Sequence, residues 1–237
     1  MIDMILTANL HVSVLVIGAI IFCLFARKNF NVKWFLGAVA LYFIYDFFLT
    51  RFYGMVPSFI GENWNWTGKL MSTAAMGVVA AFAIFGWRKV GLTFKQKEKS
   101  APAWIFLSIL SVFIFFIAIK TGDGPDDLET IAFQWTMPGI DEELFYRGVL
   151  LLALNEAFKG TRNILGAAIG FGGILTCILF GVIHALAWND GGVTWDLATF
   201  AMTGIPSFIL LWLREKTGSL IAPILAHNVA NGASCLF

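Results

Sequence analysis

Long apolar segments follow one another along the whole chain, separated by shorter polar segments. Each apolar segment has roughly the 20 residues that an α-helix needs to cross the hydrocarbon core of a bilayer. The pattern predicts eight transmembrane helices, at 4–25, 34–50, 69–87, 103–119, 139–158, 163–188, 195–213 and 218–236. The expected fold class is therefore all-α, a polytopic helical membrane protein without a soluble domain.

Composition leads to the same class of protein. Of the 237 residues, 59% are hydrophobic and 13% are charged, which is more apolar surface than a soluble domain of this length needs. Cys23, Cys177 and Cys235 lie within apolar segments and lack metal-type spacing, which indicates buried apolar side chains rather than disulfides. Met1-Ile2-Asp3-Met4 contains no basic residue, so we expect a retained first helix rather than a cleaved signal peptide.

Lysine and arginine fix the expected orientation. If eight helices alternate in direction, 12 of these residues fall on one side of the membrane and three, Arg51, Lys69 and Lys120, on the other, with Arg147 inside a segment. Positive charge is enriched in cytoplasmic loops, so both termini are expected outside the cytoplasm. The expected location is the cytoplasmic membrane of a prokaryote.

An acidic cluster, Asp141-Glu142-Glu143, interrupts the fifth apolar segment. A charged side chain at the bilayer centre costs roughly 2.5–3.5 kcal/mol, so such groups persist when they are paired, hydrated or functional. Glu143 and Arg147 are four residues apart and can form an ion pair on one helix face, while Glu142 points in a neighbouring direction and is free for chemistry. The alternative is a set of interfacial charges that cap a helix.

Two histidines and an asparagine lie in later apolar segments. At about 1.5 Å of rise per residue, Glu142, His184 and Asn231 fall at similar depths in three different helices, and His227 lies one turn from Asn231. Taken singly, His184 suits a structural hydrogen bond, and His227 with Asn231 suits a contact between helices. Their common depth instead predicts one shared polar site inside the membrane.

These residues form three motifs that resemble those of the CPBP (Abi) intramembrane proteases, a family that includes CAAX prenyl endopeptidases and proteins linked to bacteriocin processing or immunity. The motifs are Glu142-Glu143-x-x-x-Arg147, Phe180-x-x-x-His184 and His227-x-x-x-Asn231. The similarity covers about residues 130–234. It implies a catalytic helical core at 128–237, preceded at 1–127 by transmembrane helices that form a scaffold or a wall for substrate access.

The resemblance also implies a role for each motif residue in a glutamic endopeptidase. Glu142 and His184 are expected to activate a water molecule, and His227 and Asn231 to line the oxyanion hole. Supporting roles fall to Glu143, Arg147 and Phe180. No cofactor is expected, and the expected partners are a protein or peptide substrate and the lipid bilayer, with no nucleic acid.

Three alternatives stay open at this point. Glu142, His184 and His227 match the ligand types of a catalytic zinc site, although no His-Glu-x-x-His pair is present. A transporter also places acids inside the membrane, and Asp46 is a further intramembrane acid for a proton path. A non-enzymatic immunity or binding protein is the third alternative.

The identity of the substrate and the side of the membrane to which the site opens are also left open by the sequence. CAAX cleavage implies prenylated substrates and a site facing the cytoplasm. The expected topology instead favours a maturation protease for secreted or anchored proteins, with its site opening toward the outer leaflet.

Overall fold

The computed structural model describes residues 2–57, 61 and 63–237. Its described residues are mostly helical, with two short antiparallel hairpins and no closed sheet. The longer helices are α1 Ile2–Ala26, α2 Val32–Thr50, α3 Trp66–Ala81, α5 Ala101–Thr121, α9 Phe171–Ala185, α10 Leu197–Thr217 and α11 Ile221–Gly232. The shorter helices are α4 Trp87–Val90, α6 Leu128–Gln134, α7 Met137–Glu143 and α8 Leu151–Ala157, and the strands are β1 Thr161–Ile164, β2 Ala167–Gly170, β3 Leu186–Asn189 and β4 Gly192–Trp195.

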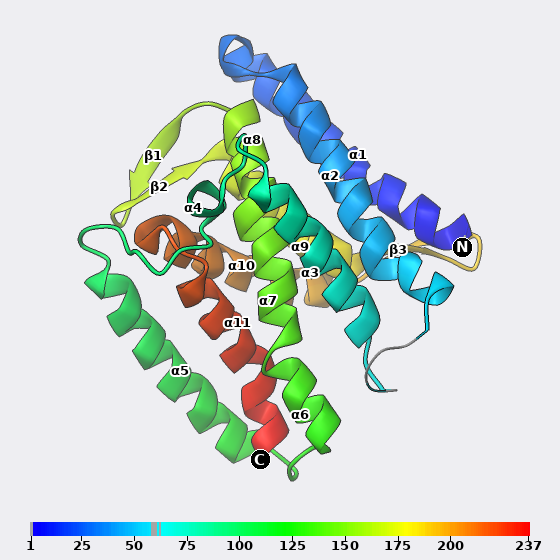
Figure 1. The fold of residues 1–237 in the computed structure, drawn as a ribbon, viewed down its shortest axis with the longest axis vertical. Helices are drawn as coiled ribbons and strands as arrows, with labels where there is room; N and C mark the ends of the chain where they lie inside the picture. Colours follow the sequence, from blue (N-terminus) through cyan, green and yellow to red (C-terminus); the bar gives the residue numbers. More distant parts are fainter. Residues whose placement is uncertain (1, 58–60, 62) are drawn as a thin grey trace.

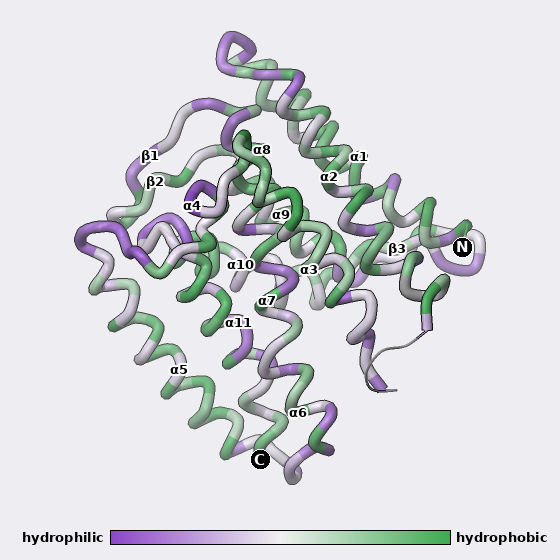
Figure 2. The backbone as a smooth tube through the Cα atoms, viewed as in Figure 1, coloured by the Kyte–Doolittle hydropathy of each residue, from purple (hydrophilic) through white to green (hydrophobic). Residues whose placement is uncertain are grey.

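Four helical segments of the described residues are long and apolar enough to cross a membrane, which confirms a helical membrane protein but not the count of eight. They are Ile2–Asn29, Val32–Thr50, Ala101–Thr121 and Leu197–Thr217. A fifth apolar helix, Phe171–Ala185, is shorter. Figure 2 shows α1, α2 and α5 as largely hydrophobic along their length, with hydrophilic residues gathered in the connecting loops.

The expected helix at 163–188 is wrong over its first part. Residues 161–170 form the β1–β2 hairpin, and the helix begins only at Phe171. The turn carries two positive φ angles, 50° at Leu165 and 81° at Gly166, and Asn163 Oδ1 accepts a hydrogen bond from Gly166 N at 2.9 Å. Such a turn suits a two-residue hairpin loop, so local turn chemistry outweighed the apolar character of the segment.

The α7–α8 segment runs through the middle of the molecule (Figure 1). Between α7 and α8, Leu144–Leu150 is a π-helical stretch in which every residue is buried. α3 and α11 pack against α7, while α2 and α9 pack against α8. π-Helical stretches are rare and often occur at functional sites, because the wider turn changes the direction of the side chains. This one directly follows the acidic cluster.

Sequence signals explain where several of these helices begin. Asn31, Asn65, Asp127 and Asp196 each accept backbone hydrogen bonds at the first turn of α2, α3, α6 and α10. Side-chain caps of this kind satisfy the free N–H groups of a helix start. Pro138 lies in the first turn of α7, where its missing N–H has no consequence. The start of the central helix is therefore set locally.

One glycine, Gly139, allows α7 and α11 to approach closely. A Cβ at Gly139 would overlap the Asn228 side chain and the Ile224 carbonyl. With no Cβ in the way, Asn228 Oδ1 accepts a hydrogen bond from Gly139 N at 2.9 Å. The contact fixes the amino end of α7 against α11, the two helices that carry the first and third motifs.

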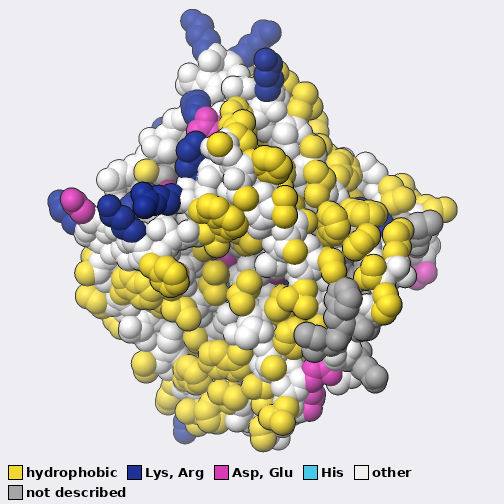
Figure 3. Space-filling view, in the orientation of Figure 1, with side chains coloured by type: hydrophobic (Ala, Val, Ile, Leu, Met, Phe, Trp, Pro, Cys, Tyr) yellow, Lys and Arg dark blue, Asp and Glu magenta, His cyan; other side chains and the backbone are white. Residues whose placement is uncertain are grey.

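Lysine and arginine gather toward one part of the molecule. In Figure 3 their side chains mark mainly the upper part and the left edge of the visible face, around the region of α4 in Figure 1. Hydrophobic side chains cover much of the remaining face. This charge distribution is the pattern that underlies the expected orientation, which stays a prediction.

Candidate active site

A buried ion pair lies at the centre of the site. Arg147 Nη1 donates to Glu143 Oε1 at 3.0 Å, and both residues are fully buried. Arg147 Nη2 also donates to the backbone oxygen of Ser207 at 3.3 Å and to its hydroxyl. The guanidinium lies 4.4 Å from the centre of the Phe180 ring. The structure thus contains the pair that the spacing predicts, and Phe180 and Ser207 complete the surroundings of its cation.

His227 connects the two glutamates. Its Nδ1 donates to Glu143 Oε1 at 2.8 Å, and its Nε2 lies 3.8 Å from Glu142 Oε2. Because the Glu143 carboxylate is an acceptor, the hydrogen bond places a proton on Nδ1 and directs Nε2 toward Glu142. The separation of 3.8 Å exceeds hydrogen-bond length, so both atoms can still contact a third group.

His184 lies on the same cavity but has a different local contact. Its Nδ1 bonds the Phe180 carbonyl one turn earlier in α9 at 2.7 Å, and its ring lies 4.8 Å from the Phe180 ring. A carbonyl is an acceptor, so this contact fixes the ring orientation and leaves Nε2 available. His184 makes no hydrogen bond to Glu142 among the described residues.

The four expected catalytic residues surround one cavity of about 560 Å³. Glu142 comes from α7, His184 from α9, and His227 and Asn231 from α11. Apolar side chains from two further helices form much of the wall: Leu110 and Ile114 of α5, and Met202, Pro206, Ile209 and Leu210 of α10. A mostly apolar cavity with a few convergent polar groups is typical of a ligand or active site.

Asn231 also borders a second, shallower hollow. That hollow is lined by Trp64, Asp126, Thr130, Gln134, Asn231, Ser234 and Cys235. Thr130 and Gln134 belong to α6, Asn231 to α11, and the remaining residues to the last turn of the chain, Ala233–Leu236, or to loops. Asn231 therefore stands between the main cavity and a surface region away from the basic loops (Figure 1).

Sequence reasoning missed Lys69. It was expected only as a charge at the outer end of the segment 69–87, yet it is 9% exposed, and its Nζ lies 2.5 Å from Glu142 Oε1 and 3.2 Å from Asp141 Oδ2. The available signal was the polar spacing of Lys69, Ser72 and Thr73, which lie three and four residues apart on one face of an otherwise apolar helix.

Asp141 was noted only as part of the acidic cluster, and the structure places it at the centre of a hydrogen-bond network. It is fully buried and accepts from the Tyr45 hydroxyl at 2.7 Å, the Ser72 hydroxyl at 2.5 Å and the Thr73 hydroxyl at 3.2 Å. Three hydroxyls and an ammonium group satisfy a carboxylate that would otherwise be costly to bury. Asp141 thus joins α2 and α3 to the motif helix.

Two other polar groups within the apolar helices, Asp46 and His11, have partners of their own. Asp46 pairs with Arg51 at 2.6 Å near the end of α2, which accounts for an acid in that segment. His11 of α1 bonds the Tyr42 hydroxyl at 2.6 Å and the Leu186 carbonyl at 2.7 Å, and so ties α1 to α2 and β3.

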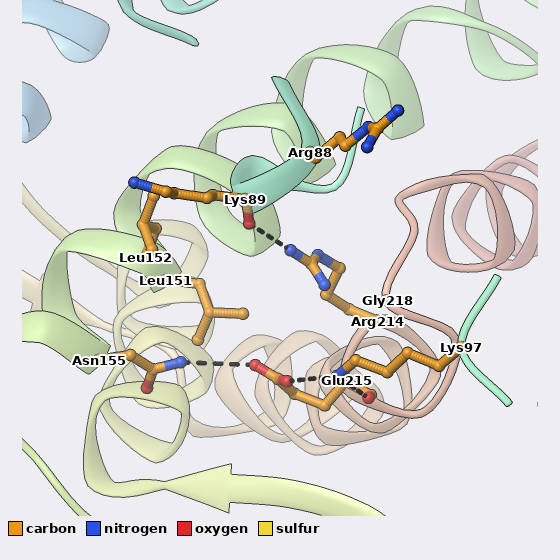
Figure 4. A pocket seen from close by; sticks show the side chains of 9 residues that line it. All are labelled: Arg88, Lys89, Lys97, Leu151, Leu152, Asn155, Arg214, Glu215 and Gly218. Atoms are coloured by element: carbon orange, nitrogen blue, oxygen red, sulfur yellow. Dashed lines mark hydrogen bonds and ion pairs between the residues drawn. The ribbon is translucent and has the colours of Figure 1, made fainter. Parts of the chain in front are cut away.

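Arg214 was expected in a short cytoplasmic turn and is instead buried in the last turn of α10. Its Nε donates to the Arg147 carbonyl at 3.1 Å, and its Nη2 donates to the Lys89 carbonyl at 2.8 Å. Figure 4 shows this side chain in a smaller cavity of about 240 Å³, near the linked side chains of Asn155 and Glu215. Arg214 therefore supports the backbone of Arg147 through its carbonyl.

The zinc alternative finds no matching ligand geometry. Among the residues that the structure describes, no group of three or more His, Cys, Asp and Glu side chains is placed to hold a metal ion. The ammonium of Lys69 also occupies one oxygen of Glu142, and a cation there opposes a second cation on the same carboxylate. Among the described residues, Glu142, His184 and His227 thus do not form a metal-type cluster, and a reaction without a cofactor stays a prediction.

Residues 125–233 match the family described as type II CAAX prenyl endopeptidase Rce1-like. The matched range contains all three motifs and every residue expected to be catalytic. No curated protein and no solved structure matches the chain. Residues 125–233 are therefore similar to the Rce1-like type II CAAX prenyl endopeptidases, a family of proteases.

Proposed function

We propose that this protein is an intramembrane endopeptidase that hydrolyses a peptide bond in a membrane-associated or secreted protein, with Glu142 as the base. The observation that carries the proposal is the position of Glu142 Oε2. This oxygen is buried on the cavity, has no hydrogen-bond partner among the described residues, and lies 3.8 Å from His227 Nε2. A general base needs a free basic atom within reach of the proton that it takes.

The first step is attack by water on the scissile carbonyl. Glu142 takes a proton from the water as its oxygen bonds to the carbonyl carbon, and His184 orients that water through Nε2. Such a mechanism needs no serine or cysteine nucleophile, and Cys177 and Cys235 do not line the cavity. The proton on Glu142 then passes to the leaving amine as the carbon–nitrogen bond breaks.

The second requirement is stabilisation of the oxyanion. Asn231 supplies an amide N–H to the cavity, and His227 supplies Nε2. With Nδ1 donating to Glu143, Nε2 donates a hydrogen bond only in the protonated ring. The role therefore calls for an imidazolium held against the Glu143 carboxylate, which Arg147 fixes in turn.

The cavity wall supports a membrane substrate. Its apolar side chains come from α5 and α10, so an extended segment or an apolar anchor can lie between these helices beside Glu142. The hollow shared by Asn231 supports access from the end that carries α6 and the chain terminus. By the distribution of Lys and Arg, that end faces the outside of the cytoplasm.

Reporter fusions test the orientation directly. A fusion after Lys99 is expected to report a cytoplasmic position, and a fusion at Phe237 a position outside. A cytoplasmic signal at Phe237 would contradict the outward-facing site without touching the proposed chemistry.

A comparison of membrane proteomes tests the function. Cells with the wild-type protein are compared with cells that carry Glu142→Gln, with Glu156→Gln as the matched control. Glu156 lies in α8 and pairs with the exposed Lys159, away from the cavity. We expect uncut precursors to accumulate in the Glu142→Gln strain and not in the wild-type or Glu156→Gln strains. Equal processing in all three strains would contradict the proposal.

A further inference from the structure

The environment of Glu142 on the side away from the cavity comes from a helix outside the matched family range. Lys69 of α3 lies between two carboxylates of α7, 2.5 Å from Glu142 and 3.2 Å from Asp141. These residues are about seventy positions apart in the sequence, so the contact exists only in the folded protein. Nothing in the three motifs assigns Lys69 a part in the reaction.

We propose that Lys69, anchored by Asp141, is a positioning residue that holds Glu142 ionised and directs its free oxygen into the cavity. The inference rests on the proposed function, because it assigns Lys69 a role in preparing the proposed base. Lys69 belongs to the helices that precede residues 125–233, so the residues that carry the three motifs do not form the whole site by themselves.

The anchoring follows from a chain of contacts. The hydroxyls of Tyr45, Ser72 and Thr73 hold Asp141. Asp141 Oδ2 then holds the Lys69 ammonium, and that ammonium in turn holds Glu142 Oε1. Because Oε1 is held by Lys69, Oε2 is the oxygen left without a hydrogen-bond partner among the described residues, 3.8 Å from His227 Nε2. A base held in this way needs little reorganisation when a substrate arrives.

The charges explain why a cation is needed here. Asp141, Glu142 and Glu143 are consecutive acids in a buried segment. Arg147 is 3.0 Å from Glu143 and also engages Ser207, so it neutralises the third acid. Within the described part of the chain, Lys69 is the lysine or arginine that pairs with Glu142. Without it, two neighbouring carboxylates would favour protonation of one, and a protonated Glu142 is not a base.

Several titratable groups face Glu142 or its partners, and each of them can contribute to the pH dependence of the site. They come from α3, α11, α9, α2, α7 and the π-helical stretch: Lys69, His227, His184, Tyr45, Asp141, Glu143 and Arg147.

Infrared titration of purified protein, labelled with ¹³C at its glutamate carboxyl groups, tests the charge role without a substrate. The difference between wild type and Glu142→Gln isolates the Glu142 band. We expect Lys69→Met to move protonation of Glu142 to higher pH by about 1–3 units, the usual effect of a close opposite charge. Lys69→Arg should titrate close to wild type. Lys120→Met, an exposed lysine at the end of α5, is the control and should leave the band unchanged.

A titration of Lys69→Met that coincides with wild type would overturn the charge role. If the shift seen in Lys69→Met is absent in Lys69→Arg, the positive charge at position 69, and not the volume of the side chain, sets the protonation of Glu142. Because Lys69→Met leaves Asp141 without its cation, the double variant Lys69→Met/Asp141→Asn removes one charge of each sign and leaves the net charge of the group unchanged. The double variant should fold, which a thermal unfolding curve in detergent verifies.

Cleavage of a precursor found in the proteome comparison tests the positioning role. At a pH where Glu142 is ionised in every variant, we expect kcat to fall between about 10- and 100-fold in Lys69→Met and in the double variant, with KM little changed. Lys69→Arg should recover most of the loss. An unchanged kcat in a folded Lys69→Met would overturn the inference. Absence of cleavage by wild type would instead contradict the proposed function, and the infrared result would still decide the charge role.

Discussion

The two parts of the chain contribute to the site in different ways. Residues 125–233 carry the three motifs, and their polar side chains surround one cavity. The helices before them match no motif, yet α2 and α3 hold Asp141 and Glu142, and α5 forms part of the cavity wall. Motifs thus mark the reacting groups, while the side chains that position those groups lie in helices whose sequence shows little beyond apolarity.

This comparison bears on the expected division of the chain at residues 127 and 128. The division stays a prediction, but side chains from both parts meet within hydrogen-bond distance around Asp141. Substitutions around Asp141 are therefore expected to lower both the stability of the protein and its kcat. Substitutions of the catalytic residues in 125–233 are expected to lower kcat more.

The largest effect is expected within the motif half. His184→Ala should lower kcat by about 10²–10⁴-fold, the usual contribution of acid–base groups. The double variant Glu142→Gln/His184→Ala should fall little further than either single one, because both residues act on one water. Rates of precursor cleavage by the purified proteins measure this. Losses that multiply would show that the two residues act independently.

Next in size is the effect of Arg147→Ala on folding. It leaves the buried Glu143 carboxylate without its cation, which we expect to cost about 3–5 kcal/mol of stability. Lys159→Ala removes an exposed pair with Glu156 and should cost no more than about 1 kcal/mol. Thermal unfolding in detergent compares the two. Equal stability of Arg147→Ala and wild type would show that the buried pair is unimportant.

A smaller effect is expected from the N-terminal part. Tyr45→Phe removes one hydroxyl from Asp141 and should destabilise the protein by about 1–3 kcal/mol, as for hydrogen bonds to charged groups. Tyr45 also stacks on Phe145 with ring centres 3.9 Å apart, and phenylalanine keeps that packing. A fall in both stability and kcat of Tyr45→Phe would show that α2 supports the site. If neither stability nor kcat changed, the contact between Tyr45 and Asp141 would be unimportant for both.

The smallest effect is expected from metal removal. Because Glu142, His184 and His227 are not placed as metal ligands, a chelator should leave cleavage unchanged. Inhibition by the chelator, reversed by added zinc, would support the metal alternative instead.

The sequence predicted the long helices well for a simple reason. In α2, α5 and α10 the apolar segment and the helix coincide to within a few residues, because a membrane helix must satisfy its backbone within itself. The segment at 163–188 failed because Ile164, Leu165 and Ile169 are apolar residues of a hairpin. Hydropathy alone does not separate a buried helix from such a hairpin.

The sequence predicted the part of the site that consists of motif residues. Glu143 and Arg147 are near in sequence, and their ion pair followed from helical spacing. Lys69 and Tyr45 were missed because their contacts with Glu142 and Asp141 depend on how α2 and α3 pack against α7. Spacing along α3 shows that Lys69, Ser72 and Thr73 share one face, but not which helix that face contacts.

The most direct test of the central claim is the cleavage of an identified precursor by purified wild-type protein and by Glu142→Gln. Glutamine keeps the size of the side chain but cannot accept a proton from water. The account predicts that Glu142→Gln folds and binds the precursor as wild type does, while kcat falls by about 10²–10⁴-fold. Cleavage by Glu142→Gln at the wild-type rate would contradict the account.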